Sequence, residues 1–325
     1  YDNYCYLPLF IFCDKQLLVA QLRSSDGDPM RGVIDELSRV VGQIREAWPK
    51  TKILIRGDSG FCREEFMVWC EAQENVDFLF GLRKNNRLID EIEYEKLLVE
   101  ADYILTGEPQ RRFKEFQYTT LNSWSRERRV IGEAECLDKG FNPRFIVTSL
   151  EAKKHPGRKL YERDYCGRGE MENRIKEQQL YLFGSRTSAH RFRANQLRLW
   201  FSGLAYVLLE SLRRLGLKGT KFERARCDTI RLKLLKIGAR VKVTARRIWT
   251  HLASSYPYQE LFIKVWKQLE RQNQYQGSSG SLSDSVRSLG ARCQSVHRGA
   301  FLEEMARVVM AFPKNTSQRN LPTSW

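Results

Sequence analysis

The sequence predicts a mixed α/β fold, in which helices flank a mixed sheet. Three observations support this fold class. In residues 1–85, short apolar segments rich in aromatic and β-branched residues alternate with segments of helical periodicity. Residues 86–162 contain strand-like segments with charged edges, which predicts a β-rich insertion. Residues 163–272 combine helical spacing with many basic residues, and residues 273–325 are expected to form a linker and a mostly flexible tail.

The segment 1–85 contains six predicted elements. Strands are expected at 4–13, 17–23, 52–58 and 76–82, and helices at 33–48 and 61–73. The order strand, strand, helix, strand, helix, strand is typical of a mixed sheet with helices packed on it.

The later elements are less regular. The chain is expected to be helical from about 163 to 215 and again over 258–272, while 235–252 fits neither period. The stretch GSSGSLSDS at 277–285 has the composition of a flexible linker. After it come one amphipathic piece, FLEEMARVVMAF, and polar residues that are expected to be flexible.

Composition excludes several classes of protein. Hydrophobic residues make up 42% of the 325 residues, which is normal for a globular chain. No apolar run approaches the ~20 residues of a membrane helix, and no signal peptide is recognisable. The eight cysteines form no CxxC pair, so they are expected to be reduced thiols rather than zinc ligands.

The basic charge is concentrated in one segment. The net charge is +16, and residues 165–247 hold 20 Lys or Arg against 6 Asp or Glu. A solvated helical surface could carry such an excess, but its concentration favours a surface that binds nucleic acid.

Residues 56–61 read RGDSGF and contain two familiar strings. GDSG surrounds the nucleophile of chymotrypsin-like proteases, whose triad runs His, Asp, Ser along the chain. All four histidines follow Ser59 in the sequence, so the chain cannot contain a triad in that order. RGD marks adhesion sites on secreted proteins, and nothing else in the sequence indicates secretion. Asp58 instead ends a buried-looking strand, where α/β sheets place reactive side chains. A helix N-cap is the competing explanation.

A second carboxylate lies in the stretch YCGRGEMENRIKEQQ at 165–179. On a regular helix, one face would carry a set spaced by three or four: Tyr165, Arg168, Glu172, Lys176 and Gln179. A surface ladder of ion pairs is the competing explanation. Carboxylates from two separate elements are suited to bind Mg²⁺, and two such ions can catalyse phosphodiester chemistry.

These stretches resemble insertion-sequence DDE transposases, whose core has the ribonuclease-H/retroviral-integrase fold. KILIRGDSGFCREE is similar to the strand and helix that carry the family's second catalytic Asp, here Asp58. Tyr165, Arg168 and Glu172 match the Y-x2-R-x3-E part of the Y-R-E-K signature around the catalytic Glu. The resemblance covers roughly residues 1–270.

Two departures from the family pattern are visible. The final Lys of the signature corresponds to Gln179, and Lys176 one turn earlier is expected to replace it. The family's first catalytic Asp lies on a strand that precedes residues 4–13. The chain is therefore expected to be N-terminally truncated, and neither Asp2 nor Asp14 takes that role.

The resemblance implies a function and a site. Asp58 and Glu172 would be metal ligands in a site for two Mg²⁺ or Mn²⁺ ions, and Arg168, Lys176 and Tyr165 would complete the catalytic set. Double-stranded DNA would be the partner, at transposon ends and target, bound by a homodimer in the bacterial cytoplasm at the nucleoid, without a membrane. The expected DNA contacts are Arg174 and four residues assigned to the next helix, Arg186, Arg191, Arg193 and Arg198.

Two alternatives remain open. A metal-dependent endonuclease of the same fold would hydrolyse DNA without joining it. A non-catalytic DNA-binding remnant would bind DNA without cutting it.

Overall fold

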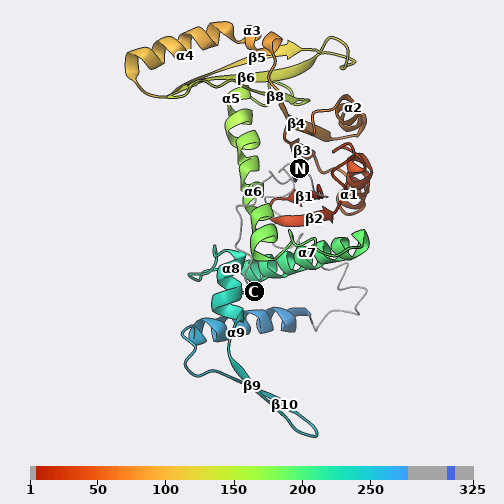
Figure 1. Ribbon diagram of the computed structural model, residues 1–325, viewed down its shortest axis with the longest axis vertical. Coiled ribbons are helices and arrows are strands. Elements are labelled where there is room, and N and C mark those ends of the chain that lie inside the picture. The colour runs from red at the N-terminus through yellow and green to blue at the C-terminus, as the bar shows by residue number, and fades with distance from the viewer. Residues whose placement is uncertain (1–4, 277–305, 312–325) are drawn as a thin grey trace. The chain divides into compact units, whose positions relative to one another are not determined.

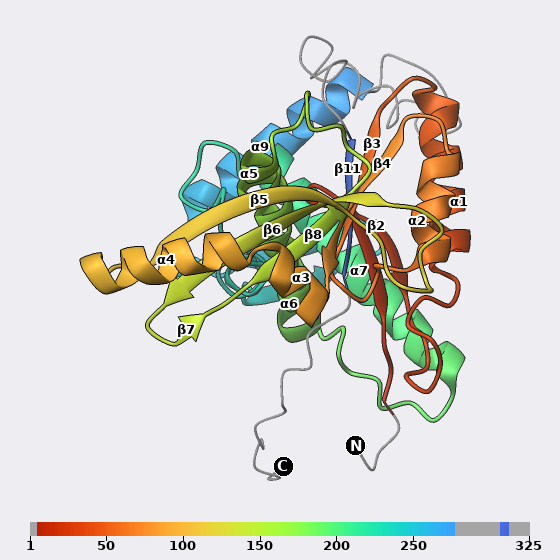
Figure 2. The same cartoon turned by 90° about the horizontal axis from the view of Figure 1, so that it is seen from above.

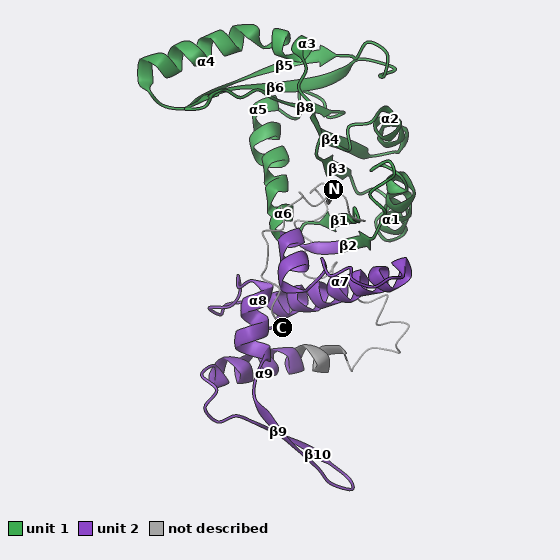
Figure 3. Cartoon of the chain, in the orientation of Figure 1, with its two compact units in different colours: residues 1–14, 18–173, 304–325 green, residues 15–17, 174–303 purple. Residues whose placement is uncertain are grey.

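The computed structural model describes residues 5–276 and 306–311 (Figure 1). The chain divides into two units, coloured separately in Figure 3. The first unit contains residues 1–14, 18–173 and 304–325, and the second contains residues 15–17 and 174–303. The linker predicted at 277–285 lies outside the described residues.

A mixed nine-stranded sheet forms the centre of the first unit. Its hydrogen-bonded order is β2-β1-β11-β3-β4-β8-β6-β5, and the short strand β7 pairs with β6. The strands are β1 (Leu9–Cys13), β2 (Gln16–Gln21), β3 (Ile53–Gly57), β4 (Val76–Leu82), β5 (Gln110–Tyr118), β6 (Arg128–Leu137), β7 (Gly140–Phe141), β8 (Arg144–Thr148) and β11 (Ala306–Ala311). The predicted mixed α/β class is therefore confirmed.

Strand β11 enters the sheet from a part of the sequence that was expected to form a mostly flexible tail. It pairs antiparallel with β1, where Phe12 faces Val309, and parallel with β3, where Ile55 faces Val308. The amphipathic pattern of FLEEMARVVMAF gave no indication of a central strand, because the partners that select this conformation lie near the other end of the sequence.

Alternating residues of the strands pack two cores on opposite faces of the sheet. Ile53 and Ile55 of β3 belong to a large core with helices α1 (Val33–Ala47) and α2 (Glu64–Ala72). Leu54 between them belongs to a smaller core on the other face, together with Leu160 and Tyr161. Figures 1 and 2 show α1 and α2 on one side of the sheet and the helical stretch from Gly157 on the other.

The segment between β4 and β8 continues the same sheet. Residues 86–106 are helical, in α3 (Asn86–Glu91) and α4 (Glu93–Thr106), and α4 is followed by the long β5–β6 pair. Strand β8 then pairs antiparallel with both β6 and β4, so the strands of this segment extend the sheet that contains β3.

Over its described residues from 174 to 276, the second unit contains helical segments and one β-hairpin. Its elements include η3 (Glu177–Tyr181), α7 (Phe192–Leu215), α8 (Cys227–Ile230), η4 (Arg231–Leu235), α9 (Gln259–Gln276) and the strands β9 (Ala239–Val243) and β10 (Ile248–Leu252). Its core contains a buried ion cluster, in which Arg213 Nη2 lies 2.8 Å from Glu177 and Nη1 lies 2.7 Å from Glu210. The shared guanidinium lets two carboxylates remain inside the unit, because each charge has a partner.

Candidate active site at the end of strand β3

The local structure around Asp58 is a tight turn after a fully buried strand. All five residues of β3 are buried, and Asp58 follows them half-buried. Its Oδ1 accepts a hydrogen bond from the backbone N–H of Gly60 at 2.9 Å, and its carbonyl accepts one from Phe61. A Cβ at Gly57 would lie 2.9 Å from the Phe61 side chain, so glycine permits this close return of the chain.

Asp58 is not the N-cap of the following helix. Helix α2 begins at Glu64, and its N-cap is Arg63. The carboxylate therefore stabilises the turn that leaves β3, with one oxygen turned back to the Gly60 amide. The alternative explanation of Asp58 as a helix cap does not fit this geometry.

The stretch that carries the other predicted site residues is helical but irregular. It consists of α5 (Gly157–Lys159), a π-helical segment η1 (Leu160–Tyr165), a 3-10 segment η2 (Cys166–Arg168) and α6 (Gly169–Lys176). The prediction is wrong in one respect, because π and 3-10 turns rotate side chains differently from α-turns. The five predicted residues do not lie on one regular α-helix: Tyr165, Arg168, Glu172, Lys176 and Gln179. Within α6, Glu172 and Lys176 do keep α-helical spacing.

A buried arginine joins this stretch to β3. Arg56, two residues before Asp58, is 7% exposed, and its Nη1 donates a hydrogen bond of 2.6 Å to the backbone carbonyl of Asp164. The contact brings Tyr165, the next residue along, to the carboxyl end of the strand.

Tyr165 reaches the backbone beside Asp58. A Cβ built on Gly81 of β4 would lie 2.4 Å from the Tyr165 hydroxyl and 3.0 Å from the Ser59 amide nitrogen. Burial raises the pKa of the Tyr165 phenol, Arg168 opposes this rise, and the charge of Asp58 adds to it. The Arg168 guanidinium lies 5.2 Å from the centre of the Tyr165 ring. The structure thus brings Asp58, Tyr165 and Arg168 together.

The remaining predicted catalytic residues lie in α6. Glu172 is half-buried and belongs to the first unit, as Asp58 does. Lys176 is exposed and belongs to the second unit. Asp58 and Glu172 therefore lie in the same unit, on two different elements.

The described residues supply only part of a metal site. Over residues 5–276 and 306–311, no group of three or more His, Cys, Asp or Glu side chains could hold a metal ion. Strand β11 occupies the position beside β3, and its sequence ARVVMA contains no carboxylate. Asp58 and Glu172 would supply two carboxylates, and water and substrate phosphate would supply the other oxygen ligands of a magnesium ion.

The predicted DNA-binding arginines lie on several elements. Arg174 is half-buried in α6, and the other four are exposed. The prediction that all four lie along the next helix is wrong for Arg186 and Arg191, because α7 begins at Phe192 and Arg191 is its N-cap. Arg193 and Arg198 do lie in α7, and Arg186 packs over the Phe183 ring at 4.3 Å. Helix starts are hard to place here since a polar loop separates two helical segments.

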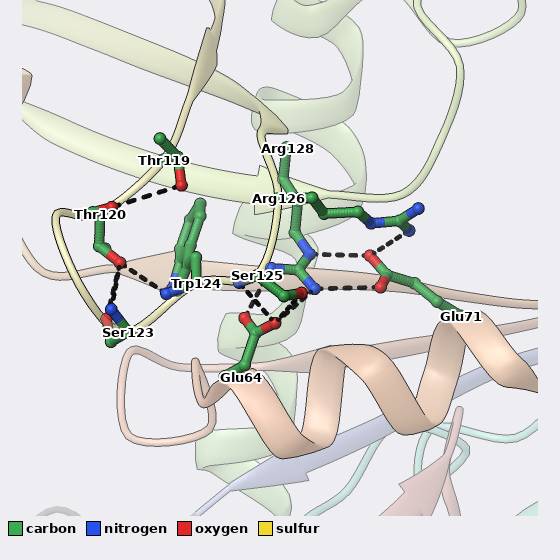
Figure 4. A network of polar contacts seen from close by, with 9 residues as sticks. All are labelled: Glu64, Glu71, Thr119, Thr120, Ser123, Trp124, Ser125, Arg126 and Arg128. Atoms are coloured by element: carbon green, nitrogen blue, oxygen red, sulfur yellow. Dashed lines mark hydrogen bonds and ion pairs between the residues drawn. The ribbon is translucent and has the colours of Figure 1, made fainter.

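Sequence reasoning missed Arg128, which holds α2 against the sheet (Figure 4). Its side chain on β6 is 2% exposed and contacts two carboxylates of α2, Glu64 at 2.7 Å and Glu71 at 2.8 Å. Ser125 donates to Glu64, and Arg126 lies 2.8 Å from Glu71. Glu64 and Glu71 are seven residues apart, about two helical turns, so they lie on the same face of α2. This spacing was the one sign in the sequence that both could contact a single cation.

The network affects the protonation of both carboxylates. Burial by itself raises the pKa of Glu64, but hydrogen bonds from Arg128 and Ser125 outweigh it, so the pKa is lowered. The pKa of Glu71 is lowered for the same reason, by Arg128 and Arg126 against burial. Both groups therefore favour the charged form that fixes α2, the helix that follows the Asp58 turn.

Comparison with protein families identifies the class of this chain. The family model described as transposase DDE domain group 1 matches residues 1–274, which is most of the chain. The chain therefore belongs to this family of DDE transposase domains, and the resemblance inferred from Asp58 and the Tyr165–Glu172 stretch is confirmed. A search of curated proteins gave no match.

The helices were also compared with the requirements of a membrane span. In the described parts of the chain, none is both long enough and apolar enough to cross a bilayer.

Proposed function

We propose that this chain is the DNA transposase of a bacterial insertion sequence, which cuts and joins DNA through a ribonuclease-H-like core. The family match supports the transposase class. The observation that carries the proposal further is the gathering of Asp58, Tyr165 and Arg168 at the carboxyl end of β3.

The proposed site uses Asp58 and Glu172 as oxygen ligands of Mg²⁺ or Mn²⁺. Such ions, two in the complete site, would polarise the scissile phosphate and activate the attacking oxygen. Arg168 would neutralise charge on a phosphate, and the Tyr165 hydroxyl, whose pKa burial raises further above neutral pH, would donate a hydrogen bond to it.

The proposed partner is double-stranded DNA, at the ends of the element and at the target, bound by a homodimer in the bacterial cytoplasm. Residues 165–247 carry a net charge of +14, which suits a polyanion. The arginines at 174, 186, 191, 193 and 198 are the proposed backbone contacts, and Lys176 would help to position Glu172 and the scissile phosphate. These contacts would contribute affinity and salt dependence rather than choice of sequence.

The first test is cleavage of supercoiled plasmid in Mg²⁺ by the parent chain and by Asp58→Asn and Glu172→Gln variants. Where the parent chain cleaves, we expect both substitutions to abolish cleavage, since each removes a ligand charge while it keeps the shape of the side chain. Glu170→Gln is the matched control: it lies in the same helix, is exposed and removes the same charge. Activity that survives in both site variants would show that other carboxylates act.

Product analysis separates the proposal from its alternatives. Joined strand-transfer products indicate a transposase, and hydrolysis without joining indicates an endonuclease of the same fold. Binding of DNA without any cleavage in Mg²⁺ or Mn²⁺ would favour the non-catalytic remnant.

A further inference from the structure

The β9–β10 hairpin is a two-stranded ribbon whose side chains are all exposed. Both strands have five residues, and every one of them is exposed. The ribbon is closed at its tip by a hydrogen bond from Thr244 to the Arg247 carbonyl at 2.9 Å and at its base by one from Ala253 to Gly238 at 2.9 Å. An isolated ribbon of this kind is at best marginally stable in water, and packing of one face against a partner would stabilise it.

The register of the hairpin separates its side chains into two different faces. Directly opposed residues lie on the same face of an antiparallel pair. Lys242 faces Trp249, and Arg240 faces His251, so these four form one basic and aromatic face. The alternate pairs are apolar or neutral and form the other face: Val243 with Ile248, Val241 with Thr250, and Ala239 with Leu252.

The charge of the hairpin has a single sign. The sequence from 229 to 259 contains seven Lys or Arg and no Asp or Glu. Among the described residues, no carboxylate forms an ion pair with Arg240, Lys242 or Arg246. The Arg247 guanidinium, at the tip, lies 5.9 Å from the centre of the Trp249 ring and keeps its donors at the surface.

We propose that the basic face of this hairpin, Arg240, Lys242, Trp249 and His251 together with Arg246 at the tip, is a contact surface for duplex DNA. The inference rests on the proposed function, because it takes DNA as the partner, and it adds a contact element that lies outside the Asp58 site. A two-stranded ribbon fits the width of the major groove. In this placement the cations meet phosphates, and the Trp249 edge lies against sugar and base edges.

Charge complementarity selects DNA over a protein partner for this face. The centre of a protein–protein interface is typically depleted in charged residues. Here the centre of the face is a Lys and an Arg without a neutralising carboxylate, a composition expected for phosphate contacts. The opposite face, with Val241, Val243 and Ile248, carries no charged side chain.

The test compares two triple variants with the same change in charge. Arg240→Thr, Lys242→Thr and Arg246→Ser remove three cations from the hairpin, and threonine keeps the strand propensity at the two β9 positions. Lys50→Ser, Lys139→Ser and Lys153→Ser remove three exposed cations from the other unit. Affinity for a fluorescent duplex is measured by anisotropy over a range of salt, with circular dichroism to check folding.

We expect the hairpin variant to bind at least about tenfold more weakly at low salt. The slope of log affinity against log salt should fall by about 2–3, since each lost phosphate contact accounts for ~0.9. The control should keep the parent slope. Equal slopes in the two variants, with a parent that binds DNA, would overturn the hairpin inference alone. A parent chain that binds no DNA would overturn the proposed function together with it.

A second experiment tests the face rather than the charge. A photo-crosslinking residue is placed at Trp249 on the basic face or at Thr250 on the opposite face, one position along the same strand. We expect DNA adducts from position 249 and few from position 250. Equal DNA adducts from both positions, or protein adducts in place of DNA at 249, would overturn the assignment.

Discussion

At the residue scale, Gly81 sets how closely Tyr165 approaches Asp58. A Cβ there would lie 2.4 Å from the Tyr165 hydroxyl, a separation that the phenol cannot keep. We predict that Gly81→Ala displaces Tyr165, lowers the free energy of unfolding by about 1–3 kcal/mol through overpacking, and reduces DNA cleavage. Urea unfolding and the plasmid assay measure the two effects.

The control for this substitution is Gly42→Ala. Gly42 lies in α1, and nothing lies within 4 Å of the position of its Cβ. Alanine there should leave cleavage unchanged and add up to about 1 kcal/mol of stability, because it has the higher helix propensity. If Gly81→Ala cleaves as well as Gly42→Ala, Tyr165 has no role in the site.

Arg128 makes the attachment of α2 dependent on pH. The folded pKa values of Glu64 and Glu71 lie below the ordinary value of 4.5, so the folded state binds fewer protons than the unfolded state there. The stabilisation is present above pH about 4.5 and is lost as pH falls through the folded pKa values. We predict that the melting temperature of the parent chain falls as the pH is lowered below about 4.5. In the Arg128→Met variant, the melting temperature should depend less on pH over the same range.

The comparison for Arg128→Met is Arg39→Met, which removes an exposed i,i+3 partner of Glu36. Exposed pairs contribute little, so this variant should follow the parent profile. If the melting temperature of Arg128→Met changes with pH over about 3–6 in parallel with that of the parent, the protonation of Glu64 and Glu71 is not coupled to folding through Arg128.

Single residues of the site were predictable to different degrees. Asp58 could be proposed as a site residue because it directly follows an apolar strand. Tyr165 and Arg168 were assigned by motif spacing, and their proximity to Asp58 follows from Gly81 and Arg56, whose partners lie far away in the chain. Arg128 could not be assigned, since both of its partners lie on α2, in a distant part of the sequence.

At the element scale, β11 is the strand that connects the two parts of the sheet. Val308 pairs with Cys13 of β1 on one side and with Ile55 of β3 on the other. We predict that Val308→Pro destabilises the first unit by about 1–3 kcal/mol, because proline removes a ladder N–H and leaves a carbonyl of the sheet without its donor. Chemical denaturation followed by circular dichroism measures the loss.

Val308→Ile is the control, since it keeps the backbone donor and the β propensity of the strand. It should unfold at nearly the same denaturant concentration as the parent chain. If the proline variant matches it, pairing of β11 contributes nothing to the stability of the sheet.

The elements of segment 1–85 were the most predictable. The predicted strand at 76–82 and helix at 33–48 agree with β4 and α1 almost to the residue, because each has a clear period and clear boundaries. The chain was predicted as helical from about 163, but the helical residues begin at Gly157, in the part assigned to the β-rich insertion. The π and 3-10 turns up to Tyr181 depend on tertiary packing and not on local propensity. The 235–252 stretch stayed ambiguous because its hairpin has no buried face to impose a clear alternation.

At the scale of the whole molecule, positive charge is unevenly distributed along the chain. Residues 165–247 carry +14 of the total +16, which leaves +2 for the rest of the chain. We predict that photo-crosslinking to duplex DNA, followed by peptide mapping, gives adducts concentrated between residues 165 and 252. Adducts distributed evenly along the chain would contradict this, and a neutral polymer with the same label serves as the control.

The central position of β11 has a consequence for synthesis of the protein. Strands β1 to β4 are complete at Leu82, but the strand that pairs with both β1 and β3 begins only at Ala306. While the intervening chain is made, β1 and β3 present strand edges with unpaired backbone groups, which invite pairing with other chains. Formation of the sheet therefore requires a contact of very long sequence separation, which is slow to form. Yield in the cell should depend on chaperones that cover these edges until Ala311 has left the ribosome.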